Sequence, residues 1–415
     1  MQITVISPFV DREHGTERAV AELIERLAGR HDDHIDLYAQ TVSDSIHYSS
    51  SDAGRSSNSG IIWHPVRAVP GPHLVQFLGW LLLNRLARRR NKAAIDAAPA
   101  IIFSPGINAF DADVILVHAV FHRVAELEKL QRKQRTQRTE RIRDSGWLRI
   151  WHRKLYYALL CALERRIYRR QDLTLAAVSK HTAMQLTHYF GRNDVTVIPN
   201  GVDACYFSPA VIAGIRERCR QQLNCLAGEF VLLLVGNDWR NKGLGILLQA
   251  VVQCKDLPIR LFVVGQDEQS PFLAEVQRLR LNDRVQFFAP VRDIRIFYAA
   301  ADCLVAPSLE DSFNLPVLEA MSCGLPVIVS RRAGISDFLS HGRDSLLLQD
   351  PESSAQLADA IRTLATKPAQ RSSLVANGLH TASTFSWDGH AEDLRRLLVK
   401  AAEKKSRLKS IQKSF

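Results

Sequence analysis

Short apolar runs alternate with amphipathic helical patterns along the chain. Segments such as "ITVISPFV" (3–10), "EFVLLLVGND" (229–238) and "IRLFVVGQ" (259–266) are rich in Val, Ile, Leu and Phe without polar alternation. Strands of that kind are buried on both faces of a parallel sheet. Between them, segments such as "GTERAVAELIERLAGR" (15–30) place apolar residues at the spacing of a helix. The pattern therefore predicts an α/β protein with parallel sheets.

The same pattern falls into two halves, which fits a chain of 415 residues. We expect two doubly wound, Rossmann-like domains that face each other across a cleft. The N-terminal domain is predicted to span residues 1–202 and to include a helix at 386–415 that crosses back, and the C-terminal domain to span 203–385. Three further segments are expected in the first half: a loop at 43–60, a strand at 113–121 and a long basic helical region at 122–170.

The net charge of +11 is concentrated in a few basic stretches, among them "NRLARRRNK" (84–92), "KLQRKQRTQRTERIR" (129–143) and "RRIYRR" (165–170). No zinc finger, RNA-binding signature or recognition helix accompanies them, so no nucleic-acid partner is predicted. Two apolar and aromatic runs, "FLGWLLL" (77–83) and "WLRIWHRKLYYALL" (147–160), lie beside the basic stretches. Basic residues next to Trp, Tyr and Leu are typical of membrane interfaces, so an anionic membrane surface is a candidate partner. Solvated helix faces are the alternative.

The cysteines and the hydropathy of the chain indicate in which cellular compartment the protein is expected. The seven cysteines include no CxxC pair and their number is odd, which argues against a disulfide framework or a zinc site and for a reducing compartment. The start of the chain has the pattern of a strand rather than of a signal peptide, and the longest apolar runs are too short to span a bilayer. We therefore expect a cytoplasmic protein, and the inner face of the cell membrane is a candidate location at which it is peripheral.

Acidic residues lie at both ends of the helical part of "LEDSFNLPVLEAMSCGLPVIVS" (309–330). The preceding "CLVAPS" (303–308) is a predicted strand, so this segment follows the carboxyl end of a sheet strand, where open α/β folds bind ligands. A helix is expected at 316–323, because Pro316 suits a first helical turn and Gly324 suits a helix end.

The start of that helix is a predicted anion site. Free backbone N–H groups at Phe313, Asn314 and Leu315 favour a phosphate there. Glu319 lies one turn into the helix and Asp311 eight positions earlier, so a carboxylate can reach each side of the phosphate. Because carboxylates accept hydrogen bonds from sugar hydroxyls, the spacing fits a ribose and a hexose on the two sides of a diphosphate, as in a nucleotide-sugar.

Cations for such a diphosphate are present in "VGNDWRNKGLGILL" (235–248). Arg240 and Lys242 follow a predicted strand and precede a predicted helix, again at the carboxyl edge of a sheet. Arg offers a bidentate fork and Lys a point charge to a phosphate. Alone, basic loop residues indicate only solvated surface, but together with residues 311–319 they favour diphosphate binding.

At this point the residues resemble a known family, the retaining GT-B glycosyltransferases of family 4 (glycosyltransferase group 1), of the bacterial lipopolysaccharide and exopolysaccharide type. The resemblance covers nearly the whole second half of the chain and is thinner over the first. It is carried by the acidic-x7-Glu signature in "PSLEDSFNLPVLEAMSCGLPVIVS" (307–330), the phosphate-binding strand and loop "VGNDWRNKGLGILLQA" (235–250), the strand before the signature in "FAPVRDIRIFYAAADCLVAPS" (288–308), the interdomain segment "VIPNGVDACYFSP" (197–209) and the N-terminal glycine loop "HGTERAVAELIERLA" (14–28).

The resemblance implies transfer of a sugar from a nucleotide-sugar with retained anomeric configuration, without a metal ion or other cofactor. In that reading Glu319 takes the ribose hydroxyls, position 311 takes hydroxyls of the donor sugar, and Arg240 and Lys242 stabilise the leaving diphosphate. The implied catalytic residues are His118, Arg240, Lys242 and Asp311. The implied donor-binding residues are Gly15, Thr16, Asn237, Arg240, Lys242, Val291, Glu310, Asp311, Ser312, Phe313, Asn314, Leu315 and Glu319.

Two positions of the second half depart from the family pattern. The first acid of the signature is usually Glu and here is Asp311, so either its loop approaches more closely or Glu310 serves instead. The family often has Arg after the strand glycine, where this chain has Asn237, so the cationic role falls on Arg240 and Lys242.

Three residues of the first half are candidates for the site. Gly15 and Thr16 are expected to form a tight turn close to the donor phosphates, or else a plain helix cap. His118 lies at the carboxyl end of a predicted strand, where the family often has a histidine or an acid that faces the reacting carbon. A buried core histidine is the alternative.

The acceptor is expected on the N-terminal domain, as a glycan or lipid-linked glycan in cell-envelope polysaccharide or lipopolysaccharide synthesis. Two other functions remain open: a non-catalytic protein that binds nucleotide-sugars, and a nucleotide-sugar epimerase on the same fold.

Overall fold

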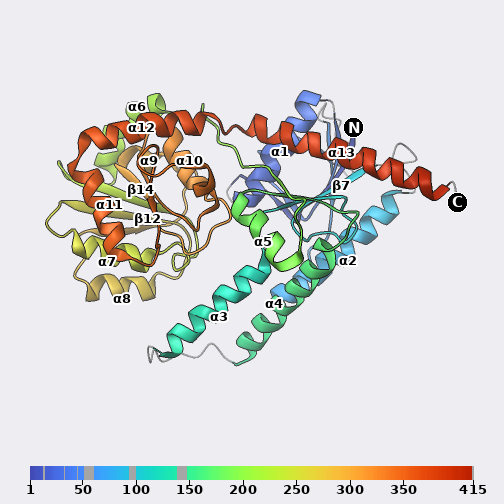
Figure 1. Ribbon diagram of the computed structural model, residues 1–415, viewed down its shortest axis with the longest axis horizontal. Coiled ribbons are helices and arrows are strands. Elements are labelled where there is room, and N and C mark those ends of the chain that lie inside the picture. The colour runs from blue at the N-terminus through green and yellow to red at the C-terminus, as the bar shows by residue number, and fades with distance from the viewer. Residues whose placement is uncertain are drawn as a thin grey trace. The chain divides into compact units, whose positions relative to one another are not determined.

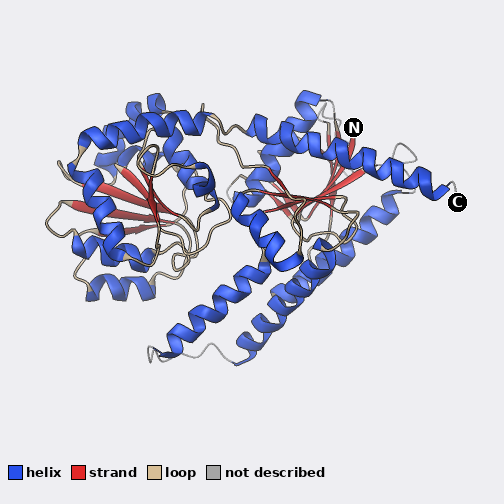
Figure 2. Ribbon diagram, in the orientation of Figure 1, coloured by secondary structure: helices blue, strands red, loops and turns tan. Residues whose placement is uncertain are grey.

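The computed structural model describes residues 1–415 except 13–14, 32, 44, 51–59, 93–99, 138–146 and 414–415. The chain forms two compact units (Figure 1). Unit 1 comprises Met1–Ile198 and Asp388–Phe415, and unit 2 comprises Pro199–Trp387. Each unit is an α/β layer structure in which helices flank a central sheet (Figure 2).

Unit 1 is built on a parallel eight-stranded sheet in the order β10-β9-β8-β7-β1-β3-β6-β5. The strands are β1 (Gln2–Ile6), β3 (His34–Ala39), β5 (Ser49–Ser50), β6 (Ile61–Pro65), β7 (Ile101–Pro105), β8 (Val114–Val117), β9 (Thr174–Ala177) and β10 (Thr196–Val197). Strands β2 (Phe9–Val10) and β4 (Thr41–Val42) form a separate short pair. The strand order reverses between β1 and β7, as in a doubly wound sheet.

The described residues of unit 1 form the helices α1 (Gly15–His31), α2 (His73–Lys92), α3 (Phe121–Gln137), α4 (Trp147–Tyr168), α5 (Lys180–Phe190) and α13 (Trp387–Lys413), whose first residue belongs to unit 2. Helices α3 and α4 pack against each other and extend away from the sheet of unit 1 (Figure 1). None of the helices in the described residues combines the length and the apolar character needed to cross a bilayer.

Unit 2 is built on a parallel six-stranded sheet in the order β13-β12-β11-β14-β15-β16. The strands are β11 (Phe230–Val235), β12 (Ile259–Val264), β13 (Val285–Phe288), β14 (Cys303–Ala306), β15 (Val327–Ser330) and β16 (Leu346–Leu348). The helices are α6 (Pro209–Gln222), α7 (Leu244–Gln253), α8 (Ser270–Arg278), α9 (Arg295–Ala300), α10 (Leu315–Ser322), η1 (Gly334–Phe338), α11 (Ser354–Thr366) and α12 (Pro368–Ser383).

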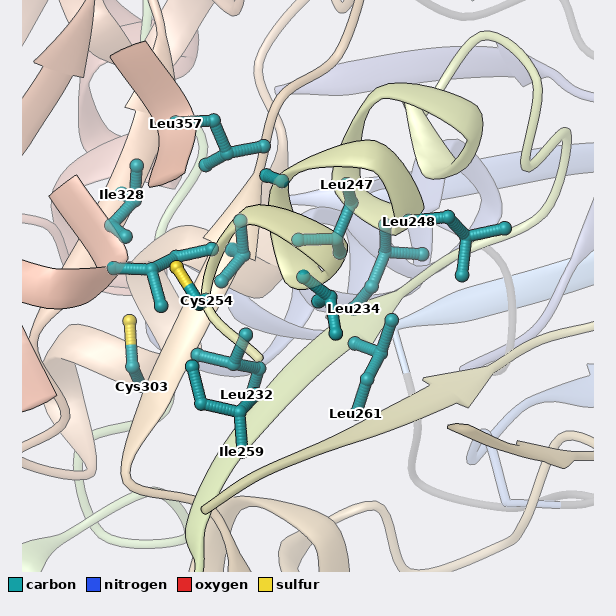
Figure 3. Packing of buried hydrophobic residues seen from close by; sticks show 14 of the residues in the cluster. Leu232, Leu234, Leu247, Leu248, Cys254, Ile259, Leu261, Cys303, Ile328 and Leu357 are labelled. Carbon is teal, nitrogen blue, oxygen red and sulfur yellow. The ribbon is translucent and has the colours of Figure 1, made fainter. Parts of the chain in front are cut away.

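The core of unit 2 fixes the strand ends that carry the site. Leu232 and Leu234 of β11 pack with Leu247 and Leu248 of α7, and all four side chains are buried (Figure 3). Burial of a leucine side chain contributes about 1.5–3 kcal/mol. The loop between β11 and α7 is therefore anchored at both ends.

The predicted fold class, two doubly wound α/β domains, is confirmed, with three local corrections. The strand expected at 113–121 ends at Val117, and α3 begins at Phe121. The basic helical region expected at 122–170 contains two helices, α3 and α4. The loop expected at 43–60 contains β5, and its residues 51–59 lie outside the described part of the chain.

Candidate active site

The strand order of unit 2 reverses between β11 and β14, which places a ligand site at their carboxyl ends. A small hollow lies there, lined among others by Val235, Lys242, Ala306 and Asn314. Asn314 has a left-handed backbone (φ 77°) and donates from Nδ2 to Ser308 Oγ (3.2 Å). Its buried Oδ1 has no hydrogen-bond partner among the described residues. A buried acceptor without a donor indicates a place for a ligand N–H, O–H or water.

The loop from β11 to α7 is shaped so that Lys242 turns back over the strand end. Gly236 has φ 134°, and a Cβ there would lie 2.7 Å from Cε of Lys242. Gly243 has φ 79°, and a Cβ there would lie 2.2 Å from the carbonyl oxygen of Pro307. Both positions therefore require glycine. The backbone N–H of Trp239 donates to Asp267 (2.7 Å), which fixes the middle of the loop.

Lys242 and Asp311 form an ion pair at this edge of the sheet. The Nζ of Lys242 donates to Oδ2 of Asp311 at 2.6 Å, and the two side chains are only 17% and 15% exposed. The structure thus brings together the predicted phosphate-binding cation and the first acid of the signature, which lie 69 positions apart in the chain. The adjacent Glu310 contributes its carbonyl oxygen, which accepts from Asn241 Nδ2 (2.8 Å).

The start of α10 differs from the predicted arrangement of free amides. The N–H of Phe313 donates to Oδ1 of Asp311 (3.1 Å), so this amide is already bound within the protein. The ring of Phe313 is buried near Phe338 and Phe385. Phe313 therefore supports the loop through packing, and Ser312 beside it is partly exposed. Helix α10 itself begins at Leu315 with Pro316 in its first turn, within one residue of the prediction.

Glu319 is a buried acid held by a tyrosine. It is 4% exposed, and its Oε2 accepts a hydrogen bond from the hydroxyl of Tyr298 at 2.7 Å. Tyr298 lies on α9 and is fully buried. Sequence reasoning did not single out Tyr298, although it lies in the motif "IFYAAAD" just before β14.

The remaining predicted residues of unit 2 have different environments. Arg240 is partly exposed and makes no ion pair with any described residue, so its guanidinium is available to an anion. Asn237 is exposed, and its Oδ1 accepts from the backbone N–H of Gln266 (2.8 Å), so its side chain joins two strand-end loops. Val291 is 39% exposed, which leaves a surface for contact with a base.

In unit 1, His118 follows β8 and is partly buried. Its Nε2 is closed off from solvent and has no hydrogen-bond partner among the described residues. Burial, and after it the neighbouring His390, lowers the pKa of His118 to about 3, so the imidazole is neutral at physiological pH. Gly15 and Thr16 form the first turn of α1 itself instead of a tight turn before it.

Within the described residues, possible metal-ligand atoms of His122, Cys161 and Glu164 lie within 4.8 Å of one another in unit 1. The oxygens of Glu164 already accept from the N–H groups of Phe121 and His122 (2.7 and 2.9 Å) and from Nδ1 of His122 (2.7 Å). Glu164 is fully buried, and burial raises its pKa to about 7. These contacts make Glu164 the cap of α3, which begins three residues after His118.

Comparison with known proteins identifies what this arrangement is. The family model described as "Glycosyl transferases group 1" matches residues 229–367, and the one described as "Glycosyltransferase Family 4" matches residues 14–205. The crystal structure of WaaG, a glycosyltransferase involved in lipopolysaccharide biosynthesis, superposes with a TM-score of 0.73 at 20% identity, over 95% of this chain and 99% of that one. The chain is a glycosyltransferase with the GT-B fold.

Relatives of this glycosyltransferase act on different acceptors. The D-inositol 3-phosphate glycosyltransferase of Pseudarthrobacter chlorophenolicus is 27% identical over 339 residues, which cover 78% of this chain and 75% of the relative. The lipopolysaccharide glucosyltransferase WaaG of Escherichia coli (strain K12) is 28% identical over 269 residues, which cover 63% and 69%. The Anabaena Alr3699/HepE structure in complex with UDP-glucose superposes with a TM-score of 0.69 at 20% identity, over 96% of this chain and all of that one. The enzyme class is thus shared, and the acceptor is not fixed by similarity.

Proposed function

We propose that this glycosyltransferase moves a sugar from a nucleotide-sugar, with retention of configuration, to a lipid-linked glycan at an anionic membrane surface. The observation that carries the donor half is the ion pair of Lys242 with Asp311 at the point where the strand order of unit 2 reverses, together with the buried Glu319 on the helix that follows Asp311. A diphosphate there meets Lys242 and Arg240, a donor sugar meets Asp311, and a ribose meets Glu319.

The chemistry assigned to these residues is stabilisation of a leaving group. When the bond from the anomeric carbon to the diphosphate breaks, negative charge develops on the diphosphate. Lys242 and the guanidinium of Arg240, which has no ion-pair partner in the described part of the chain, supply fixed positive charge, so the proposal includes no metal ion. The neutral imidazole of His118 is assigned to positioning the donor sugar or acceptor. Retention rests on the resemblance of residues 311–319 to the acidic-x7-Glu signature.

A transfer assay tests the donor half. The protein is incubated with UDP-, GDP-, ADP- and dTDP-sugars and a lipid extract as acceptor source, and release of the nucleoside diphosphate and the anomeric configuration of the product are measured. We expect release of one nucleoside diphosphate together with a product of retained configuration. An epimerase would instead yield a new nucleotide-sugar without acceptor, and a binding protein would yield no turnover with any acceptor.

The membrane half of the proposal rests on two neighbouring helices of unit 1. Helix α2 exposes an apolar stripe of Val75, Leu78, Leu82 and Leu86, spaced as one face of a helix, and Leu82 is 59% exposed. On α4, Trp151 is 66% exposed, and Leu155 one turn later is 53% exposed. The two helices are in contact, with Phe77 of α2 against Tyr156 of α4.

Basic side chains frame these apolar residues. On α2, Arg85 and Arg89 are exposed beside the stripe, and on α4 Lys154 is exposed next to Leu155. An apolar stripe flanked by arginine and lysine is the pattern of helices that lie in the headgroup region of an anionic membrane. We therefore assign the acceptor-bearing surface to the inner face of the cell membrane, in lipopolysaccharide or exopolysaccharide synthesis.

Vesicle flotation tests the membrane half. At low salt, wild type is expected to float with vesicles containing phosphatidylglycerol and not with phosphatidylcholine alone. The double variant Leu78→Ser/Leu82→Ser should bind about tenfold or more weakly, since each leucine loses apolar burial. Leu226→Ser is the matched control, because Leu226 is an exposed leucine (65%) of unit 2. Equal binding by the double variant and wild type, or no flotation of wild type, would contradict the membrane half of the proposal and favour a soluble acceptor.

A further inference from the structure

The buried hydrogen bond between Tyr298 and Glu319 joins two elements of unit 2. The hydroxyl of Tyr298, on α9, donates to Oε2 of Glu319, on α10, at 2.7 Å. The same hydroxyl lies 3.5 Å from the carbonyl oxygen of Pro316. Tyr298 is fully buried and Glu319 is 4% exposed, so little water competes for this bond. Hydrogen bonds from hydroxyl groups to carboxylates are stronger than hydrogen bonds between two neutral groups, and they are stronger still when they are buried away from solvent.

A carboxylate at this position needs a fixed donor in order to hold one orientation. The last torsion of a glutamate side chain is broad and roughly two-fold, so the plane of the carboxylate is not set by the helix. A donor that holds Oε2 sets that plane. The two oxygens of a carboxylate offer about four lone-pair sites, and the bond from Tyr298 occupies one of them.

The ring of Tyr298 is held by an aromatic neighbour. Its ring stands edge-on to Phe207, with centroids 5.7 Å apart and an interplanar angle of 87°. The carbonyl oxygen of Phe207 accepts from Oγ of Ser322 at 2.7 Å, and Ser322 lies at the end of α10. The segment that carries Phe207 is therefore fixed to the end of α10 and packs against the ring of Tyr298, whose hydroxyl donates to Glu319 on the same helix.

From this geometry we infer that Tyr298 is a positioning residue for nucleotide recognition: it orients Glu319 toward a ribose hydroxyl and so makes the donor site select ribonucleotides over deoxyribonucleotides. The inference rests on the proposed function, in which Glu319 takes the ribose. Selection of ribose over deoxyribose in the nucleotide is thereby assigned to Tyr298, a residue outside the acidic signature. Tyr298 acts through Glu319 and does not touch the substrate itself.

Isothermal titration with matched nucleotides tests the inference. Wild type, Tyr298→Phe, Glu319→Gln and the double variant are titrated with UDP, GDP and ADP and with their 2′-deoxy and 3′-deoxy forms. Tyr298→Phe keeps the ring against Phe207 and removes only the hydroxyl. Tyr206→Phe is the matched control, because the hydroxyl of Tyr206 donates to a different acid of unit 2, Asp293, at 3.0 Å.

For the base that binds, we expect wild type to prefer the ribonucleotide over one deoxy form by about tenfold or more, as for a hydrogen bond to a charged group. Tyr298→Phe should reduce this preference several-fold. The double variant should lose no more of the preference than Glu319→Gln alone. Tyr206→Phe should keep the wild-type ratio of affinities. The inference is overturned if Tyr298→Phe weakens the ribo and deoxy forms equally, which is the result of a purely structural role, or if it changes neither. Should Tyr298→Phe not fold, the same ratios in Glu319→Gln decide, since an unchanged preference there also overturns it. Absence of binding by every nucleotide to wild type would instead contradict the proposed function.

Discussion

The ion pair between Lys242 and Asp311 predicts an unusual response to one substitution. In the ligand-free protein, Lys242 is neutralised by Asp311 at 2.6 Å, whereas the proposed function gives Lys242 to the diphosphate of the donor. Asp311→Asn removes the competing charge. The substitution keeps an oxygen that can accept from the N–H of Phe313, so the start of α10 is preserved. The variant should therefore bind nucleoside diphosphate more tightly and yet transfer sugar more slowly.

The size of the effect follows from the exposure of the pair. A hydrogen bond to a charged group contributes about 1.5–3 kcal/mol, and side chains that are 17% and 15% exposed retain some solvent screening. Breaking the pair on nucleotide binding then costs wild type about 1–2 kcal/mol, and this cost is absent in Asp311→Asn. Because 1.4 kcal/mol is tenfold in affinity, the dissociation constant of the nucleoside diphosphate should fall about 5–30-fold. Transfer should fall by about tenfold or more, because the donor sugar loses a charged acceptor.

Calorimetric titration of the nucleoside diphosphate and a turnover assay with the matching nucleotide-sugar measure the two effects. Asp283→Asn is the matched control, since it makes the same substitution at an exposed aspartate before β13, away from the strand ends of the site, and leaves the pair intact; both values should stay near wild type. Lys242→Met should weaken binding. Unchanged or weaker binding of the nucleoside diphosphate by Asp311→Asn would refute the reasoning, because the pair would then not compete with the ligand.

Three further predictions follow from local geometry. Gly243→Ala should destabilise the protein by about 1–3 kcal/mol in thermal melts and weaken nucleotide binding, because φ is 79° and the new Cβ would meet the Pro307 carbonyl at 2.2 Å. The control Gly245→Ala has open space around its Cβ and should be neutral or slightly stabilising in the same melts. The depressed pKa of His118 means that the unfolded chain binds an extra proton between about pH 6.5 and 3, so the free energy of unfolding falls as pH drops through this window, by up to about 1.4 kcal/mol per pH unit. His118→Gln should lose less stability than wild type between pH 7 and 5.5 in denaturant titrations, and an equal loss would contradict the assignment. Transfer should persist in EDTA, because Arg240 and Lys242 provide the positive charge; a loss restored by Mg²⁺ would contradict this.

The alternation of apolar strand patterns with helical patterns, and the Pro and Gly residues at element ends, predicted much of the fold. Strands such as β11 and β12 are continuous apolar runs because both faces are buried, and that pattern is visible in the sequence. Helix α10 begins and ends within a residue of its predicted bounds because Pro316 and Gly324 mark its two ends locally. The short strand β16, with only three residues (Leu346–Leu348), carries no comparable local signal and was not predicted.

The contacts of the site were harder to predict, because they join residues that are distant in the chain. The sequence indicated Lys242 and Asp311 as site residues, but not that they pair with each other, which depends on β11 and β14 being neighbours in the sheet. The side chain of Asn237 joins the loop after β12, and this contact is set by strand order, which the residues around Asn237 do not indicate. Glu164 caps a helix that begins 43 positions earlier, and nothing local in its own helix signals that role.

The central claim is that unit 2 holds a nucleotide-sugar between Lys242 and Glu319. The most direct measurement is the melting temperature of wild type and of Glu319→Ala against a panel of UDP-, GDP-, ADP- and dTDP-sugars, since a ligand that binds only the folded state raises it. The account predicts that one nucleotide-sugar stabilises wild type and that Glu319→Ala loses most of the shift. Equal stabilisation of both proteins, or no shift with any nucleotide-sugar, would contradict it.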